Sequence, residues 1–155
     1  MKPLVSSVAA STILAATILF PITGNAAPPP PNPAMSVRVV SVTPTTVIRK
    51  NPTVTFRLQL RVKGIVLDAR HIGKANVRGH GHVQVYVDRI PADAYVRRDL
   101  KQHWLASLAG TNLRITVPPT LVGGRGTHRL IVALAQNNYV LYRGASPAST
   151  TITVK

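Results

Sequence analysis

Apolar and polar residues alternate without a break from Thr53 to Lys63. A period of two places successive side chains on opposite faces of an extended chain, whereas an amphipathic helix has a period of about 3.6 residues. The segment therefore predicts a long antiparallel strand whose apolar face packs in a core and whose other face is wet and cationic. Arg57, Arg61 and Lys63 fall on the cationic face.

The rest of the chain from Ser36 onward is also patterned for short strands. Glycine, proline and asparagine separate the apolar runs, and no long segment follows a helical period. Further strands are predicted within residues 37–43, 83–87, 104–108, 113–117, 128–135 and 152–154. A set of about seven or eight short strands predicts an all-β domain built as an antiparallel β-sandwich, with a small β-barrel as the alternative.

The amino-terminal residues have the features of a secretory signal peptide. Lys2 precedes an apolar stretch over residues 3–20, and Gly24 and Ala26 occupy the −3 and −1 positions of a cleavage site. We therefore predict a signal peptide at 1–26, with an uncleaved membrane anchor as the alternative. A proline-rich tether at 27–35 and one folded domain at 36–155 follow. Cleavage leaves a protein without a transmembrane helix, secreted or held in the extracytoplasmic cell envelope.

The composition is strongly basic. Lysine and arginine number 19 against 4 acidic residues, which gives a formal net charge of +15 at pH 7. A surface of this sign attracts polyanions, so the predicted partner is an anionic envelope polymer or lipid surface. A specific nucleic-acid partner is not expected, because the aromatic residues are not interleaved with the basic ones as in single-strand-binding modules. The lack of cysteine excludes disulfides and thiol chemistry.

Two segments resemble a known class of domain. They are residues 81–88, with the sequence GHVQVYVD, and residues 126–134, with the sequence GTHRLIVAL. Together they resemble bacterial exported immunoglobulin-like β-sandwich domains, in which a strand ending in Val-Tyr-Val-Asp-Gly meets a later strand that opens with Gly-Thr-His. The resemblance covers residues 36–155 and implies an immunoglobulin-like sandwich without assigning a function. The chain departs from that pattern at Arg89, which replaces a turn glycine, and at Gln84, where some relatives have a second histidine.

Histidines provide the candidate metal ligands. His80 and His82 lie two residues apart, so on an extended chain their side chains point to one side and can share a copper or zinc ion. His128 or His71 is the candidate third ligand. His128 also shares its parity with the apolar residues of the strand at 128–135, which predicts a structural histidine at the rim of the core, hydrogen-bonded to a loop carbonyl.

Catalytic motifs are lacking. The sequence has neither a strand-to-helix nucleophile elbow nor paired carboxylates, and no cofactor motif accompanies the glycines at 123–126. We therefore predict an exported non-enzymatic binding or structural module of the cell envelope, without a cofactor. It acts through a cationic surface of Arg57, Arg61 and Lys63, which Arg38, Arg114 or Arg129 on neighbouring strands are candidates to widen. The alternative is an extracytoplasmic copper- or zinc-binding protein that uses His80 and His82.

Overall fold

A computed structural model describes residues 34–96 and 104–155, and these residues form strands and three short 3₁₀ helices. The predicted signal peptide and most of the predicted tether lie outside the described residues. The strands are β1 (Ser36–Thr43), β2 (Thr46–Val47), β3 (Val54–Lys63), β4 (Val66–Leu67), β5 (His80–Val87), β6 (Ala106–Leu108), β7 (Asn112–Val117), β8 (Gly126–Ala135) and β9 (Ala148–Val154). The 3₁₀ helices are η1 (Ala69–His71), η2 (Ala92–Tyr95) and η3 (Pro119–Val122).

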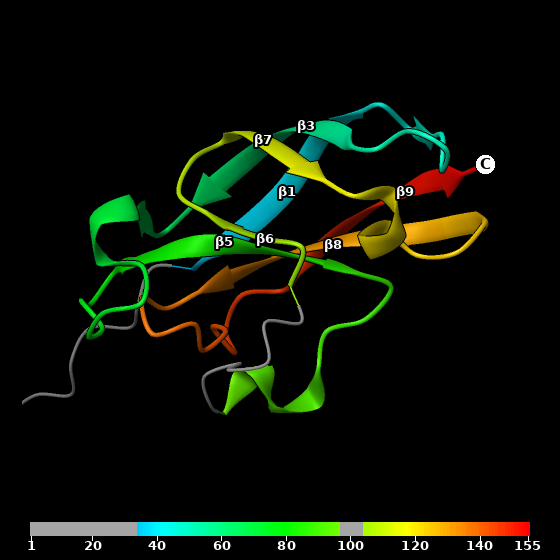
Figure 1. Ribbon diagram of the computed structural model, residues 1–155. Helices are drawn as coiled ribbons and strands as arrows, with labels where there is room; N and C mark the ends of the chain where they lie inside the picture. Colours follow the sequence, from blue (N-terminus) through cyan, green and yellow to red (C-terminus); the bar gives the residue numbers. More distant parts are fainter. Residues whose placement is uncertain (1–33, 97–103) are drawn as a thin grey trace, which may run out of the picture. The chain divides into compact units, whose positions relative to one another are not determined.

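The strands form two sheets that pack face to face (Figure 1). Sheet A has three strands in the order β1-β3-β7, and both of its pairings are antiparallel. Sheet B has the order β2-β9-β8-β5-β4, and β6 also pairs with β5. The chain is thus an immunoglobulin-like β-sandwich, as the strand pattern and the resemblance predict, and the barrel alternative is not adopted.

The core between the sheets confirms the alternation predicted for β3. Phe56, Leu58 and Leu60 are buried, whereas Arg57 and Arg61 are exposed. The buried residues of β3 join one apolar cluster with inward-facing residues of sheet B. These sheet B residues are Val83 and Val85 on β5, Leu130, Val132 and Leu134 on β8, and Ile152 and Val154 on β9. Full burial of each large apolar side chain contributes about 1.5–3 kcal/mol, so this layer stabilises the pairing of the two sheets.

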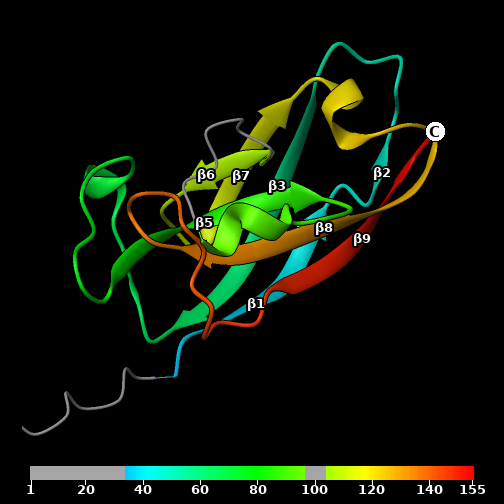
Figure 2. The same ribbon diagram turned by 90° about the horizontal axis from the view of Figure 1, so that it is seen from below.

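The middle of sheet B, formed by β5 and the second half of β8, is buried on both faces, which the sequence analysis did not predict. Its outer face carries Tyr86, Ile131 and Ala133, and these pack with Leu141 and with Trp104. Seen from below, η2 lies across β5 and β8 (Figure 2). A strand covered on both sides loses the apolar-to-polar alternation, which is why the second half of β8, from Leu130 to Ala135, is a continuous apolar run.

Two short strands were also not predicted. β2 pairs with β9, β4 pairs with β5, and both pairings are parallel. β2 and β4 lie at the two edges of sheet B, whose other pairings are antiparallel. Each has only two residues, which is too short to show a periodicity in the sequence.

Gly81 marks a close approach between neighbouring strands. It pairs with Leu67 of β4, and a Cβ atom at this position would overlap the backbone carbonyl oxygen of Ala135 on β8. That atom would also lie 2.8 Å from Cδ1 of Ile65. The carbonyl oxygen of Ala135 is part of the β8 backbone, so it cannot move away from an added Cβ without disturbing the sheet.

We expect Gly81→Ala to lower the free energy of unfolding by about 1–3 kcal/mol, the usual cost of overpacking. The matched control is Gly124→Ala, because an added Cβ there meets nothing within 4 Å. Its expected effect is below about 0.5 kcal/mol. Urea unfolding of both variants measures the difference, and equal stability of the two variants would contradict this account of Gly81.

Candidate functional site

The outer face of sheet A gathers basic and amide side chains from three strands. Arg57 of β3 lies directly opposite Thr43 of β1 on one side and Arg114 of β7 on the other. We call Thr43, Arg57 and Arg114 the arginine row. Two positions further along β3, Gln59 lies between Ser41 and Asn112, and we call these three residues the amide row.

Two more pairings continue the basic surface toward the end of β3. Arg61 lies opposite Arg38, and Lys63 lies opposite Ser36. The side chains of all three strands alternate in the same phase here, since the partners of exposed β3 residues are themselves exposed. The sheet therefore presents Arg38, Arg57, Arg61, Lys63 and Arg114 on one face, which we call the cationic face.

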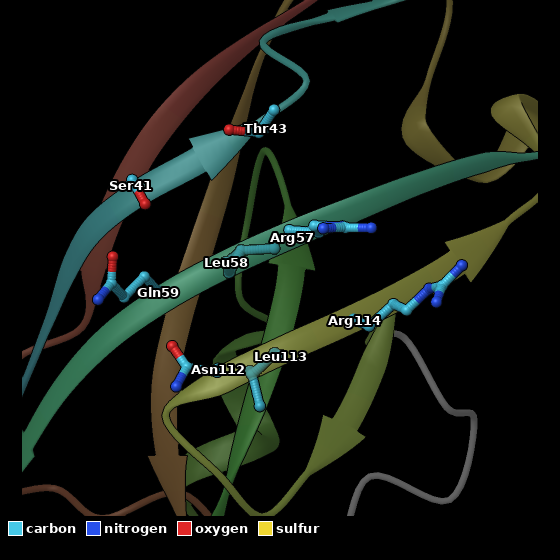
Figure 3. A pocket seen from close by; sticks show the side chains of 8 residues that line it. All are labelled: Ser41, Thr43, Arg57, Leu58, Gln59, Asn112, Leu113 and Arg114. Carbon is cyan, nitrogen blue, oxygen red and sulfur yellow. The ribbon is translucent and has the colours of Figure 1, made fainter.

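The arginine and amide rows line an open depression of about 620 Å³ (Figure 3). Leu58 and Leu113, which are buried in the core, also line it. Figure 3 shows the side chains of Arg57 and Arg114 extending toward the same side, away from the amide row. The depression therefore has a charged end and a neutral, hydrogen-bonding end.

The aspartates of the described residues belong to segments outside sheet A. Asp68 lies just before η1, Asp88 follows β5, and Asp93 belongs to η2. Asp68 is engaged with His71 and His80, and Asp88 is engaged with His128. The guanidinium groups of Arg57 and Arg114 thus have no ion-pair partner among residues 34–96 and 104–155.

The placement of the predicted basic residues follows the sequence analysis, and the strand order decides which others join them. Arg57, Arg61 and Lys63 lie on one exposed face, and Arg38 and Arg114 widen it. Arg129 does not, because it belongs to β8 of sheet B, where it pairs with Thr151. The amide row was not singled out from the sequence. The one local sign of this row in the sequence was that Gln59 falls on the polar side of the alternation in β3.

His82 does not reach a site shared with His80. Its side chain is 0% exposed and packs edge-on against the ring of Tyr139, with ring centroids 5.3 Å apart. Neither ring nitrogen has a hydrogen-bond partner among the described residues. Burial lowers the pKa of His82 to about 4, so the ring is neutral at pH 7.

His80 is held by a carboxylate instead. Its Nδ1 lies 2.9 Å from Oδ2 of Asp68, and Nδ1 of His71 lies 2.6 Å from the same oxygen. These two hydrogen bonds, His80 first, lower the pKa of Asp68 to about 2. Within the described residues, no group of three or more His, Cys, Asp or Glu side chains is arranged to hold a metal ion. The copper or zinc hypothesis therefore gains no support from this geometry.

His128 has the structural role that its parity predicts. Its Nε2 lies 2.7 Å from the carbonyl oxygen of Gly124, and its Nδ1 lies 2.7 Å from Oδ2 of Asp88. The bond to Asp88, followed by that to Gly124, raises the pKa of His128. Asp88 also accepts a hydrogen bond from the backbone N–H of Arg129, so the pair ties the end of β5 to β8. His128 is not available as a third metal ligand in this arrangement.

Within residues 34–96 and 104–155, no helix is long and apolar enough to span a membrane. No family model matches the chain, and no curated protein matches it. Among solved structures, the fibronectin(III)-like modules of Clostridium thermocellum CbhA share 13% sequence identity with it at a TM-score of 0.37, over 77% of this chain and 95% of that chain. The PKD domain of human KIAA0319 shares 12% identity at a TM-score of 0.35, over 85% of this chain and 92% of that chain.

Proposed function

We propose that the protein is an exported, non-enzymatic binding or structural module of the cell envelope that binds an anionic polymer through the cationic face. The observation that carries this proposal is the concentration of Arg38, Arg57, Arg61, Lys63 and Arg114 on one face of sheet A, where none of them forms an ion pair with a described aspartate. The predicted signal peptide supports the export, and the lack of catalytic motifs in the sequence supports a binding role.

The physical basis of the binding is electrostatic. Adjacent cations on a stiff sheet create a positive potential that attracts a polyanion at long range. A bound polyanion releases its condensed counterions, so the affinity falls steeply as salt is added. A polymer gains more from this face than a single small anion does, because its repeated charges reach several rows at once.

The first test removes charge from β3. We expect the variant Arg57→Gln/Arg61→Gln/Lys63→Gln to bind an anionic envelope preparation at least about tenfold more weakly than the unchanged protein at low ionic strength. The matched control is Lys74→Gln/Arg78→Gln/Arg125→Gln, which removes two arginines and one lysine from exposed positions outside sheet A. The control should lose only a small fraction of the affinity. Co-sedimentation over a salt series measures both variants.

Two results would overturn the proposal. Binding that persists unchanged near 1 M salt, where the Debye length is about 3 Å, cannot depend on exposed charge. Equal losses in the two triple variants would show that only the net charge matters and that sheet A has no special part.

A further inference from the structure

The cationic face contains a like-charge pair that the sheet holds in place. Arg57 and Arg114 are directly opposite one another on antiparallel strands, where Cβ atoms lie about 5 Å apart. Like charges in this position destabilise a sheet. No described carboxylate relieves the repulsion. An anion placed between the two guanidinium groups would relieve it.

The chemistry of two facing arginines selects among anions. Each guanidinium is a planar fork that donates two parallel hydrogen bonds. A carboxylate has two coplanar oxygens whose lone pairs all lie in one plane, so it accepts from two forks only where both approach in that plane. A sulfate or phosphate monoester has three terminal oxygens in a pyramid, so it can accept from two forks that approach from different directions. A phosphodiester has only two such oxygens and fits the pair less well.

The neighbouring row indicates what carries the anion. Gln59, Asn112 and Ser41 lie about 7 Å from the arginine row along the strands, and they line the same depression. Amide and hydroxyl groups on an open floor match the hydroxyls of a sugar, because each can both donate and accept. The outward-facing side chains of β1, β3 and β7 in this depression include no aromatic ring on which a base could stack.

We propose that the ligand is a polysaccharide carrying sulfate or phosphate monoester groups. Arg57 and Arg114 clamp one ester group between them, and the amide row contacts hydroxyls of the adjoining sugar. This inference rests on the proposed function and narrows it from any anionic polymer to one class. A nucleic acid, a lipid surface and a polyuronate are the alternatives that the test separates.

The test keeps the charge and changes only the donor geometry. In the variant Arg57→Lys/Arg114→Lys, two cations remain but the forks are lost. We expect its affinity for dextran sulfate to fall about tenfold, the size of one lost bidentate charge-assisted interaction. Its affinity for polygalacturonate should fall less than its affinity for dextran sulfate, because a carboxylate engages the two forks less fully than a sulfate ester does. Phosphorylated dextran distinguishes the two esters, and Arg78→Lys/Arg125→Lys is the control away from sheet A.

A second variant tests the sugar contacts. Gln59→Thr/Asn112→Thr keeps residues that suit a strand but replaces each amide with a shorter side chain that has one hydroxyl group. We expect weaker binding to dextran sulfate and unchanged binding to poly(vinyl sulfate), which has the ester groups without the sugar. Isothermal titration at fixed salt measures all of these affinities.

The failure of this inference differs from failure of the proposed function. If the unchanged protein binds dextran sulfate and polygalacturonate equally and the lysine variant keeps both affinities, the clamp is wrong while binding through charge stands. Competition experiments at equal total charge give a further check. The clamp would also be wrong if a single-stranded oligonucleotide or anionic phospholipid vesicles displaced the protein as strongly as dextran sulfate does. Binding to none of the polymers would remove the proposed function itself.

Discussion

Replacing Leu58 with alanine is expected to lower the free energy of unfolding by about 2–5 kcal/mol. Leu58 is 1% exposed and lies on β3, the central strand of sheet A, where it faces the layer between the two sheets. Truncation removes apolar surface from the core and leaves a cavity that the two flanking strands prevent from closing. Urea unfolding followed by circular dichroism measures the loss.

The neighbouring residue is the matched control. Arg57 differs from Leu58 by one position, and its side chain lies on the opposite, solvated face. Arg57→Ala should change the free energy of unfolding by less than about 0.5 kcal/mol. Because it removes one of two facing like charges, a slight gain in stability is consistent with the arrangement. Equal losses at the two positions would mean that the faces of β3 are assigned wrongly.

Acidification from pH 6.5 to pH 4 is expected to cost about 3 kcal/mol of stability through His82 alone. The pKa of His82 is about 4 in the folded protein, against 6.5 for an ordinary histidine. Between these values the unfolded chain binds a proton that the folded chain does not, so stability falls as the pH falls. The cause is burial, since protonation would place a charge beside Tyr139 with no described hydrogen-bond acceptor.

Other titrating groups act in different pH ranges. The pKa of His128 is raised, so its contribution is complete below 6.5 and is lost as the pH rises through the folded value. Asp68 and Asp88 have lowered pKa values, and their contributions are lost only as the pH falls below about 3.8. Among these groups, His82 is therefore the main source of a change in stability between pH 6.5 and pH 4. His80, two residues away on the same strand, is bonded to Asp68.

The variant His82→Leu tests this assignment. Leucine fills a similar space without polar atoms, so we expect near-normal stability at pH 7 and a much flatter pH dependence between 6.5 and 4. His71→Gln, at a half-exposed position, should keep the steep dependence of the unchanged protein. Urea unfolding at pH 7.0, 5.5 and 4.5 measures each slope. A slope that survives in His82→Leu would exclude His82 as its source.

The fold was largely predictable from local patterns, and the exceptions have a common cause. In β3 and β7 one face meets water, so the alternation is visible in the sequence and the strands were placed correctly. β5 and the second half of β8 are covered on both faces, so their sequence pattern predicts strands but does not show which side chains are fully buried. His80 and His82 were paired by parity alone, and the covering layer with Tyr139 separates their environments.

The sequence by itself determined that the chain is basic, all-β and built with one cationic side on β3, because charge and side-chain parity are properties of a single segment. Only the tertiary structure decided which strands flank β3. In that structure Arg38 lies opposite Arg61 and Arg114 lies opposite Arg57, whereas Arg129 belongs to the other sheet. Strand order depends on pairings between residues distant in the chain, and the two-residue period of one strand carries no information about its neighbours.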